Sequence, residues 1–343
     1  MIKIIIVGLN DLTTTFLRIL CEIKKGKKYP QILDGIGPYS ASDIECISVF
    51  DTNKHFLGRS LGDVLGIKNC VYSSINISPG ILIDTPPKNI VRRISFQSAE
   101  VDDLRNILNN LNADVAIIAV NSFAEKTVKK YAQLFAEKGI SVINTTPIRL
   151  AYDEEIVKLF EERNSIIVGD FIRGLIDYYY FELWISKLCE TFGLKVKEIF
   201  TKIYVGGIEG GSLTMEKMRS RILHATSAYL KAIFPQARDT GSAIEWRQFL
   251  HSYKKKYLLA LLEDTFGNEI NITFQLMTNS VSDSAFILFD VVRAIMLARN
   301  AKLRGRIDEI CYYGFIFTDK KKPRDPKELS KTFRAFLSKL SSQ

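Results

Sequence analysis

The stretch from Asp114 to Gly174 constrains the fold more than any other part of the chain, because short apolar runs alternate in it with longer amphipathic segments. The apolar runs are Val115–Val120, Ile140–Ile143 and Ile166–Val168, and the amphipathic segments are Glu125–Lys138 and Tyr152–Arg163. Such alternation is typical of βα units. It predicts an α/β fold built on a doubly wound parallel sheet that helices cover.

Small or polar residues follow each of these apolar runs. Asn121 and Ser122 follow the first run, Asn144 and Thr145 the second, and Asp170 the third. Doubly wound sheets bind ligands outside the carboxyl ends of their strands. We therefore expect these five side chains to line one crevice, and we take them as candidate cofactor contacts.

The first residues of the chain have the pattern of a β-turn-α unit. An apolar run, Ile2–Gly8, precedes an amphipathic segment that begins at Asp11. The dinucleotide fingerprint G-x-G-x-x-G needs its glycines so that the backbone can approach a pyrophosphate. Here Gly8 is present, but Asn10 and Thr13 occupy the two other glycine positions. We take Gly8, Asn10 and Asp11 as candidate cofactor contacts, and we predict that the turn binds a dinucleotide weakly or not at all.

The next apolar run, Ile44–Phe50, ends in Asp51. An acidic side chain at this place in a nucleotide-binding unit accepts a hydrogen bond from a ribose hydroxyl. An acidic residue that ends a strand is also an ordinary surface residue. The sequence leaves both interpretations open, and Asp51 joins the candidate cofactor contacts.

The pattern changes after Gly193. Three strand-like runs follow, Lys195–Val205, Tyr257–Glu263 and Ile270–Met277, without βα alternation between them. The stretch Gly206–Lys256 has a glycine-rich entry and contains helical segments, and it is predicted to be mobile or ordered by a ligand. Ser282–Arg299 is predicted to be an amphipathic helix with Ser280 or Ser282 as its N-cap. We therefore predict a Rossmann-like domain from residues 1–192 and 280–343. An inserted β-sheet domain for substrate and oligomer contacts is predicted at residues 193–279.

Composition and charge exclude several classes of protein. Of the 343 residues, 47% are hydrophobic and 25% charged, which is ordinary for a globular chain of two structural units. No apolar span approaches the roughly twenty residues that a bilayer requires, and no leader-like segment opens the chain, so we expect a cytoplasmic protein with no membrane partner. The net charge of +9 is spread over short basic clusters with few aromatic residues. That distribution favours a solvated surface or a small phosphorylated ligand over nucleic acid.

The five cysteines are scattered singly along the chain. They are Cys21, Cys46, Cys70, Cys189 and Cys311. No C-x-x-C pair or histidine spacing suits a zinc site. We predict five buried free thiols and no metal site.

Several segments, in order over about residues 1–318, resemble the myo-inositol-1-phosphate synthase family, in particular its compact archaeal and actinobacterial branch. Gly37–Glu45 resembles that family's GY-x-x-SDIE run, and Phe50 with Asp51 resembles its FD run. Asn144 and Pro147 match its FVN-x-x-P run, and Gly169–Arg173 matches GDD-x-KSQ. Further along the chain, Val205–Gly207 matches VGGN, Phe266–Gly267 matches FG, and Ser284–Arg293 matches NSAG-x-x-x-D-x-x-R. The order and spacing of these segments carry the resemblance.

The resemblance implies a Rossmann-like domain with bound NAD, a β-sheet domain inserted near residue 193, and a homotetramer. It also implies a phosphorylated sugar as substrate, because family members convert glucose 6-phosphate to inositol phosphate by oxidation, enolisation, an aldol ring closure and re-reduction. Cations near the phosphate and near the developing enolate oxygen suit such chemistry. Lys256 is the one family lysine that this chain matches, Arg173 stands in place of another, and Asp170 matches the first acid of the GDD run. We take these three as candidate catalytic residues.

This chain differs from the family at positions that take part in this chemistry. Arginine does not release a proton near neutral pH, so Arg173 can hold a phosphate but cannot serve as an acid or base. The segment Leu223–Ser227 matches a lysine-rich family segment but has no lysine, and Ile208 and Ser280 replace a family asparagine and aspartate. We therefore predict little or no synthase activity on glucose 6-phosphate.

Three functional hypotheses remain open. The first is an active NAD-dependent inositol-phosphate synthase or related cyclase, an isomerase of inositol and phospholipid biosynthesis, in which His224 or Lys231 replaces a lost lysine. The second is a catalytically silent paralogue that acts as a structural or regulatory homo-oligomer. The third is a Rossmann-type oxidoreductase with another substrate.

Overall fold

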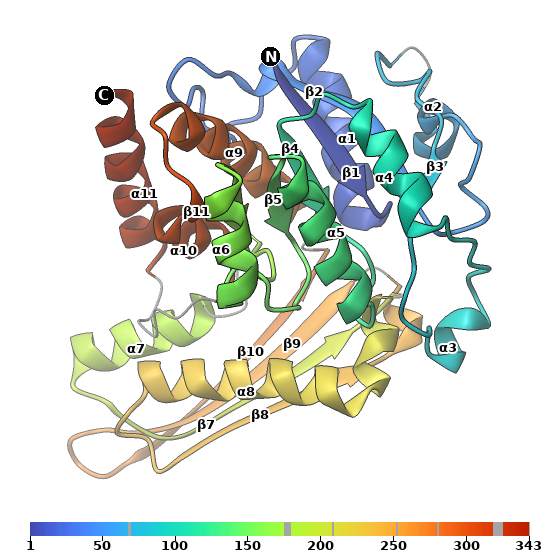
Figure 1. Cartoon of the computed structure of the whole chain (residues 1–343). Helices are drawn as coiled ribbons and strands as arrows, with labels where there is room; N and C mark the ends of the chain where they lie inside the picture. The colour runs from blue at the N-terminus through green and yellow to red at the C-terminus, as the bar shows by residue number, and fades with distance from the viewer. Residues whose placement is uncertain are drawn as a thin grey trace. The chain divides into compact units, whose positions relative to one another are not determined.

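The computed structural model describes residues 1–67, 70–174, 180–207, 209–251, 253–279, 281–317 and 325–342. Contacts between residues divide the chain into two compact units. The first unit comprises Met1–Arg173, Val281–Thr318 and Ser330–Gln343, and the second comprises Gly174–Ser280 and Asp319–Leu329. Figure 1 shows both units, each of which is described separately below.

The first unit is built on a seven-stranded sheet whose strand pairs are all parallel. Its order is β11-β6-β5-β4-β1-β2-β3. The strands are β1 (Ile2–Val7), β2 (Ile44–Asp51), β3 (Ser78–Pro79), β4 (Val115–Ile118), β5 (Ser141–Asn144), β6 (Ile166–Val168) and β11 (Gly305–Arg306). The chain builds outward from β1 to β3 and then returns to β4 on the other side of β1, so the strand order reverses there. The doubly wound parallel sheet predicted from the alternating pattern is confirmed.

Helices cover both faces of this sheet. The helices of this unit are α1 (Asp11–Lys24), α2 (Leu61–Leu65), α3 (Lys88–Val91), α4 (Val101–Asn109), α5 (Glu125–Glu137), α6 (Glu154–Glu162), α9 (Val281–Asn300), α10 (Asp308–Gly314) and most of α11 (Pro326–Ser341). Helices α1 and α9 pack together on one face, and α4, α5 and α6 cover the other (Figure 1). The apolar faces of α1 and α5 that the sequence predicted face the sheet and are buried.

Helix α9 differs from its prediction. It was expected to be amphipathic, but Ile287, Leu288 and Phe289 are consecutive and all fully buried. The helix packs against both α1 and α10, so it has no solvent-facing stripe. The predicted cap residue Ser280 and the side chain of Ser282 lie outside the described residues. In α11, Phe333 stacks on Tyr313 with ring centroids 3.8 Å apart, so this part of the C-terminal helix docks on the first unit.

The second unit is a mixed four-stranded sheet with the order β10-β9-β7-β8. Its elements are α7 (Tyr180–Phe192), β7 (Lys195–Val205), α8 (Glu216–Ile233), β8 (Asp239–Trp246), β9 (Lys254–Glu263) and β10 (Glu269–Thr278). Strands β7 and β8 are parallel, whereas β9 pairs antiparallel with both β7 and β10. Helix α8 confirms the helical segments predicted within Gly206–Lys256, but strand β8, which also forms there, was not predicted. The expectation that βα alternation is absent from this part of the chain was wrong. The unit therefore contains one βαβ unit, β7-α8-β8.

The two faces of this second sheet differ. On one face, apolar side chains of α7, such as Leu183, Ile185 and Cys189, join the apolar cluster of β7 and β9. Helix α7 therefore groups with the second unit, and the boundary between units falls near Arg173 instead of at the expected residue 193. On the opposite face Phe200 and Leu259 lie side by side on paired strands and are 39% and 49% exposed.

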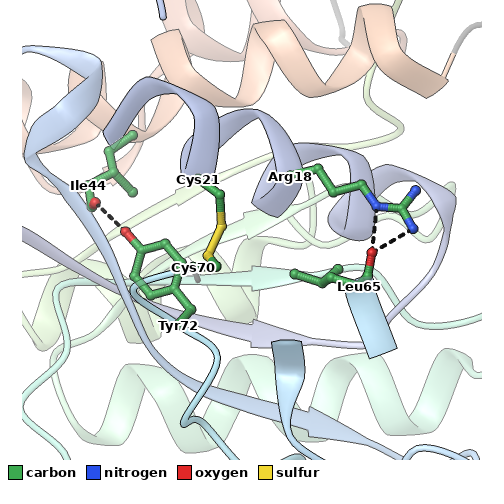
Figure 2. The surroundings of a disulfide bond; sticks show 6 residues. All are labelled: Arg18, Cys21, Ile44, Leu65, Cys70 and Tyr72. Carbon is green, nitrogen blue, oxygen red and sulfur yellow. Dashed lines mark hydrogen bonds between the residues drawn. A yellow bond between two sulfur atoms is a disulfide. The ribbon is translucent and has the colours of Figure 1, made fainter. Parts of the chain in front are cut away.

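Two of the five cysteines form a disulfide bond, which corrects the prediction of five free thiols. Cys21 of α1 is bonded to Cys70, with their Cα atoms 5.8 Å apart, and both are buried (Figure 2). Nearby, Arg18 donates two hydrogen bonds to the carbonyl of Leu65, and the Tyr72 hydroxyl donates to the carbonyl of Ile44. The segment after α2 is thus fastened to α1 and β2. The other three cysteines, Cys46, Cys189 and Cys311, are free and buried as predicted.

Candidate functional site

A cavity of about 60 Å³ lies at the carboxyl ends of β1, β2 and β4, where the strand order of the first unit reverses. Among the predicted residues, Gly8, Asn10, Asp51 and Asn121 line it. Ligands of doubly wound sheets bind at this place in the fold. The cavity therefore brings together four of the sequence-predicted cofactor contacts.

Gly8 is needed for packing at the end of β1. It has a φ of +93°, and a Cβ atom there would lie 2.6 Å from the carbonyl oxygen of Ala119 in the neighbouring strand exit. Any side chain would therefore push β1 and β4 apart. Gly8 keeps the two strand ends close whether or not a ligand binds.

Asn10 caps helix α1 with its own side chain. Its Oδ1 accepts hydrogen bonds from the backbone N–H groups of Leu12 (3.0 Å) and Thr13 (3.1 Å), and its Nδ2 donates to the carbonyl of Ala119 (2.9 Å). The Thr13 hydroxyl donates to the carbonyl of Gly8 (2.8 Å) and accepts from the backbone N–H of Asn10 (3.1 Å). The two residues that replace fingerprint glycines thus form a reciprocal cap.

The turn does not fit the pyrophosphate of a dinucleotide. A pyrophosphate at a helix N-terminus is held by backbone N–H groups of the turn and first helical residues. Here the N–H groups of Leu12 and Thr13 donate to Asn10, and that of Leu9 donates to Asp51 (2.6 Å). The side chain of Asp11 is exposed in the first turn and adds a negative charge at that place. The backbone donors of Leu9, Leu12 and Thr13 are therefore already in use.

Asp51 is buried at the end of β2 and lines the cavity. Its carboxylate accepts backbone N–H groups from Leu9 and Asn53, both at 2.6 Å. Burial raises the pKa of Asp51, and these hydrogen bonds oppose that rise because they favour the charged form. The acid predicted to meet a ribose thus faces the cavity, although part of its acceptor capacity is used by the backbone.

The apolar part of the cavity wall was missed by the sequence analysis. It includes Ile94, Phe96 and Tyr131. Ile94 and Phe96 come from the segment between α3 and α4, for which the sequence analysis named no candidate, and Phe96 forms an isolated bridge with Asn53. Tyr131 comes from α5 and accepts a hydrogen bond from the backbone N–H of Ile81 (2.7 Å). Only Tyr131 carried a signal, since it is an aromatic residue on the buried stripe of a predicted helix.

Asn144 and Asp170 lie in a separate, closed hydrogen-bond network. The Asn144 Nδ2 donates to Asp170 (2.7 Å) and to the carbonyl of Ile148 (2.6 Å), while the backbone N–H groups of Leu150 (2.8 Å) and Ala151 (3.2 Å) also donate to Asp170. Asp170 is fully buried, and desolvation raises its pKa to about 7. Its peptide bond with Gly169 is cis. The network fixes the loop after β5, so these polar side chains serve the loop's structure.

Thr145 and Ser122 are not part of the cavity wall. The Thr145 hydroxyl donates to the carbonyl of Ile118 (2.9 Å), and its backbone N–H donates to the same oxygen (3.0 Å), which ties the end of β5 to β4. Ser122 lies one residue beyond Asn121 and does not line the cavity. The single crevice expected from the strand exits is therefore divided into the cavity at Asp51 and the network at Asp170.

Arg173 is buried beside Tyr313 of α10. Its Nε donates to the Tyr313 carbonyl, and its guanidinium lies over the Tyr313 ring with 4.9 Å between Cζ and the ring centroid. The Tyr313 hydroxyl in turn donates to Asp290 (2.7 Å), which forms an ion pair with Arg293 (2.7 Å). Burial raises the pKa of Tyr313 and of Asp290 and lowers that of Arg293. Arg293 also donates to the carbonyl of Leu33 (2.8 Å), so this group links α9 and α10 to the loop before β2.

Lys256 belongs to the second unit and is neutralised there. Its Nζ donates to both carboxylate oxygens of Glu182, at 2.5 and 2.8 Å, and the Thr201 hydroxyl donates to the same carboxylate (3.0 Å). The side chains of Lys256 and Glu182 are 2% and 0% exposed. Lys256 lies on the helix-covered face of β9 with Leu258 and the other buried residues of that strand. It is therefore half of a buried ion pair in the core of the unit.

The sequence analysis did not predict Glu182 as the partner of Lys256, although the sequence indicates that both residues lie on buried faces. Lys256 is two residues from Leu258, so the period of a strand places both on one face. Glu182 precedes Ile185 and Cys189 by three and seven residues, so the period of a helix places all three on the buried stripe of α7. A buried lysine needs a carboxylate, but the pattern does not show that these two elements pack together.

The described residues show no group of three or more potential metal ligands. Within the same residues no helix has the length and apolarity needed to span a membrane. Ile208, which departs from the VGGN motif, lies outside the described residues.

Comparisons with known proteins point to one group of relatives. No family model matches the chain. An inositol-3-phosphate synthase of Corynebacterium glutamicum is 24% identical over 335 residues, which cover 89% of this chain and 90% of that protein. Among solved structures, a myo-inositol-1-phosphate synthase-related protein of Thermotoga maritima has a TM-score of 0.83 at 17% identity and covers 98% of both chains. An inositol-3-phosphate synthase of Caenorhabditis elegans has a TM-score of 0.70 at 11% identity, covering 99% of this chain and 85% of that one.

Proposed function

We propose that the chain, as a divergent relative of the inositol-3-phosphate synthases, has kept their fold but does not cyclise glucose 6-phosphate. In this proposal the protein is a catalytically silent homo-oligomer. The tests below can also support the alternative hypothesis, that the protein is an active synthase.

The observation that carries the proposal is the ion pair of Lys256 with Glu182. A lysine that stabilises an enolate must bring uncompensated positive charge to the developing oxyanion. Both oxygens of Glu182 already take hydrogen bonds from Lys256 in a fully buried setting. Drawing Lys256 toward a substrate would leave the Glu182 carboxylate buried without its partner, which costs about 3–5 kcal/mol.

The other candidate catalytic groups support the same conclusion. Asp170 is closed inside the network with Asn144, and Arg173 lies against Tyr313. Each lost oxyanion contact costs about 2.7–4 kcal/mol in the transition state. Two such losses slow turnover by about ten-thousandfold or more.

The exposed face of the second sheet supports a homo-oligomer. Phe200 and Leu259 are adjacent on it, and Tyr257 and Met277 lie on the neighbouring rows of the same face. A sheet face with adjacent exposed apolar side chains is often covered by a partner, and two-fold pairing with a second copy is the commonest solution. Light scattering of the wild type should give a multiple of the 39.0 kDa chain mass.

A matched pair of variants tests the role of this face. Leu259→Lys places a charge at its centre, whereas Ile83→Lys places one on a similarly exposed apolar residue of the first unit. We expect a lower mass for the first variant only. A wild-type mass near 39.0 kDa at micromolar concentration would remove the oligomer from the proposal.

The central test is product formation. Purified protein is incubated with glucose 6-phosphate and NAD, and inositol phosphate is measured beside the Corynebacterium glutamicum relative under the same conditions. We expect a rate at least about a thousandfold below that of the relative. A comparable rate would restore the enzyme hypothesis.

A further inference from the structure

A larger cavity, of about 510 Å³, lies in the first unit between the loop before β2 and the last turns of α11. Its lining residues come from 33–37 in the loop and from 334–342 in and after the helix. The volume is within the range of about 300–1,000 Å³ that is usual for small-molecule sites. None of the lining residues belongs to the cavity at Asp51 or to the network at Asp170, so this cavity is a separate place in the fold.

The loop side of this cavity is fixed by hydrogen bonds to α9. The backbone N–H of Leu33 donates to Asp290 (3.1 Å), and Arg293 donates to the Leu33 carbonyl (2.8 Å). Ile36 and Tyr39 exchange backbone hydrogen bonds of 3.0 and 3.1 Å across the turn. The loop therefore has one defined shape before any ligand arrives, and binding does not have to order it.

The helix side carries a polar stripe. Arg334, Ser338 and Ser341 follow one another at intervals of four and three residues, so they lie on one side of α11, and all three line the cavity. Phe333 and Leu337 are buried and anchor the helix to the unit. The polar stripe is therefore held in a defined position beside the loop.

The apolar side chains of the wall offer a ligand little surface. Ile36 and Leu337 are only 1% and 7% exposed, and Leu33 is half-buried. Apolar binding energy grows with the area that a ligand removes from water, and little apolar area is accessible here. A ligand of this cavity must therefore be mainly polar.

One end of the polar stripe offers hydrogen-bond donors. Arg334 has no ion-pair partner in the part of the chain that the structure describes, and its Nε makes only a long hydrogen bond to Ser330 (3.4 Å). The Ser338 hydroxyl makes no hydrogen bond to any other described residue. A guanidinium pairs with a carboxylate through two parallel hydrogen bonds. Arg334 is the only charged residue of the wall within the described ranges, so it matches a single negative charge better than a doubly charged phosphate.

The other end of the stripe offers acceptors. The Ser341 hydroxyl donates to the carbonyl of Leu337 (3.0 Å), and that of Ser342 donates to the carbonyl of Lys339 (2.9 Å). Their protons are used, but the hydroxyl oxygens keep lone pairs that can accept. The last turn of a helix also leaves carbonyl oxygens without intrahelical partners. This end therefore suits hydroxyl groups of a ligand, which can donate to it.

We propose that this cavity binds a small monocarboxylate that carries several hydroxyl groups, as a sugar acid does. The carboxylate pairs with Arg334 and accepts from Ser338, while the hydroxyls of the ligand donate to Ser341 and Ser342. This inference goes beyond the proposed function, because it concerns a different site and no turnover. It can fail while that proposal stands.

Three probes separate the parts of this recognition. Gluconate carries both the carboxylate and the hydroxyls, glucitol has only the hydroxyls, and hexanoate has only the carboxylate. Titration of the full chain, followed by saturation-transfer NMR, should give a dissociation constant of about 1 mM for gluconate, as expected for a small ligand in an open site. Glucitol and hexanoate should each bind at least about fivefold more weakly, because each lacks one half of the contacts.

A matched pair of variants assigns the binding to this cavity. Arg334→Gln removes the charge in the wall, and we expect gluconate to bind at least about fivefold more weakly. Lys331→Gln removes the same charge from an exposed residue of the same helix that does not line the cavity. It should change gluconate binding by less than about twofold. Both residues are exposed, and circular dichroism checks that both variants fold.

Three results would overturn the inference. Gluconate that does not saturate the wild type below about 50 mM would remove the site. Equal losses in Arg334→Gln and Lys331→Gln would show a diffuse attraction to the basic helix instead of a site. Hexanoate that binds as tightly as gluconate would show that the hydroxyls are not recognised.

Discussion

The strand ends of the first unit and the helix-covered face of the second sheet both contain polar residues that the sequence analysis named as candidates. These residues have different surroundings in the two places. At the strand ends, Asp51 and Asn121 line a cavity and remain accessible to a ligand. On the second sheet, Lys256 is buried and bonded to Glu182. A residue that matches a family motif can therefore keep its position while its charge is compensated by an ion pair within the protein. The surroundings of a matched side chain, and not the match, determine whether it can do chemistry.

The largest effect that would sharpen this comparison is the loss of one partner of the buried ion pair. Lys256→Met leaves Glu182 buried without a counter-charge, and we expect the free energy of unfolding to fall by about 3–5 kcal/mol. The double variant Lys256→Met with Glu182→Leu removes both charges and should recover stability to within about 1 kcal/mol of wild type. Denaturation by urea measures all three proteins.

The neighbouring residue provides the control. Lys255→Met changes a lysine that lies over the Tyr257 ring on the other face of the same strand. Its expected cost is below about 1 kcal/mol. If Lys256→Met were as mild as this control, Lys256 would not be structural and the contrast between the two regions would fail.

The second effect concerns the disulfide that fastens the segment after α2 to α1 in the first unit. Replacing both Cys21 and Cys70 by alanine should lower the free energy of unfolding by about 2–4 kcal/mol, because the cross-link closes a long loop in the unfolded chain. A strong reductant should destabilise wild type by a similar amount and leave the double variant unchanged. A reductant that affects both proteins equally would show that the bond does not contribute in this way.

The smallest effect is a dependence on pH from Asp170. Burial raises its folded-state pKa to about 7, above the ordinary unfolded value, so the folded state binds the proton more tightly. The resulting stabilisation is complete below about pH 4 and is lost as pH rises toward 7, by at most about 1.4 kcal/mol per pH unit. Stability measured from pH 4 to 7.5 should therefore fall more steeply in wild type than in Asp170→Asn. Parallel curves for the two proteins would contradict the assignment.

The sequence predicted the first unit well and the second unit in part. The alternation around Val115–Val120 specifies βα units because buried parallel strands need continuous apolar runs, and such runs are readable without tertiary information. Strand β8 was missed because its polar residues and Gly241 give a weak strand signal, and it forms by pairing with β7. Helix α9 was expected to have a polar face, and only its packing between two other helices explains why that face is buried.

The candidate site was predictable where a residue's place at a strand end or its type determines its position, as for Asp51, Asn121 and Gly8. Gly8 could be assigned because its turn needs a positive φ and a close approach to β4. The Cys21–Cys70 bond and the Lys256–Glu182 pair each join residues far apart in the chain, 49 and 74 positions respectively. Their pairing depends on which elements pack together. Spacing alone does not contain that information.

The most direct test of the central claim compares product formation in wild type and in the folded double variant Lys256→Met with Glu182→Leu. The double variant removes the lysine without the instability of the single change, so any difference in rate reports chemistry. The account predicts that glucose 6-phosphate and NAD give no inositol phosphate above background with either protein. A wild-type rate in the ordinary enzyme range of about 1–1000 per second, abolished in the stable double variant, would contradict it and make Lys256 a catalytic residue.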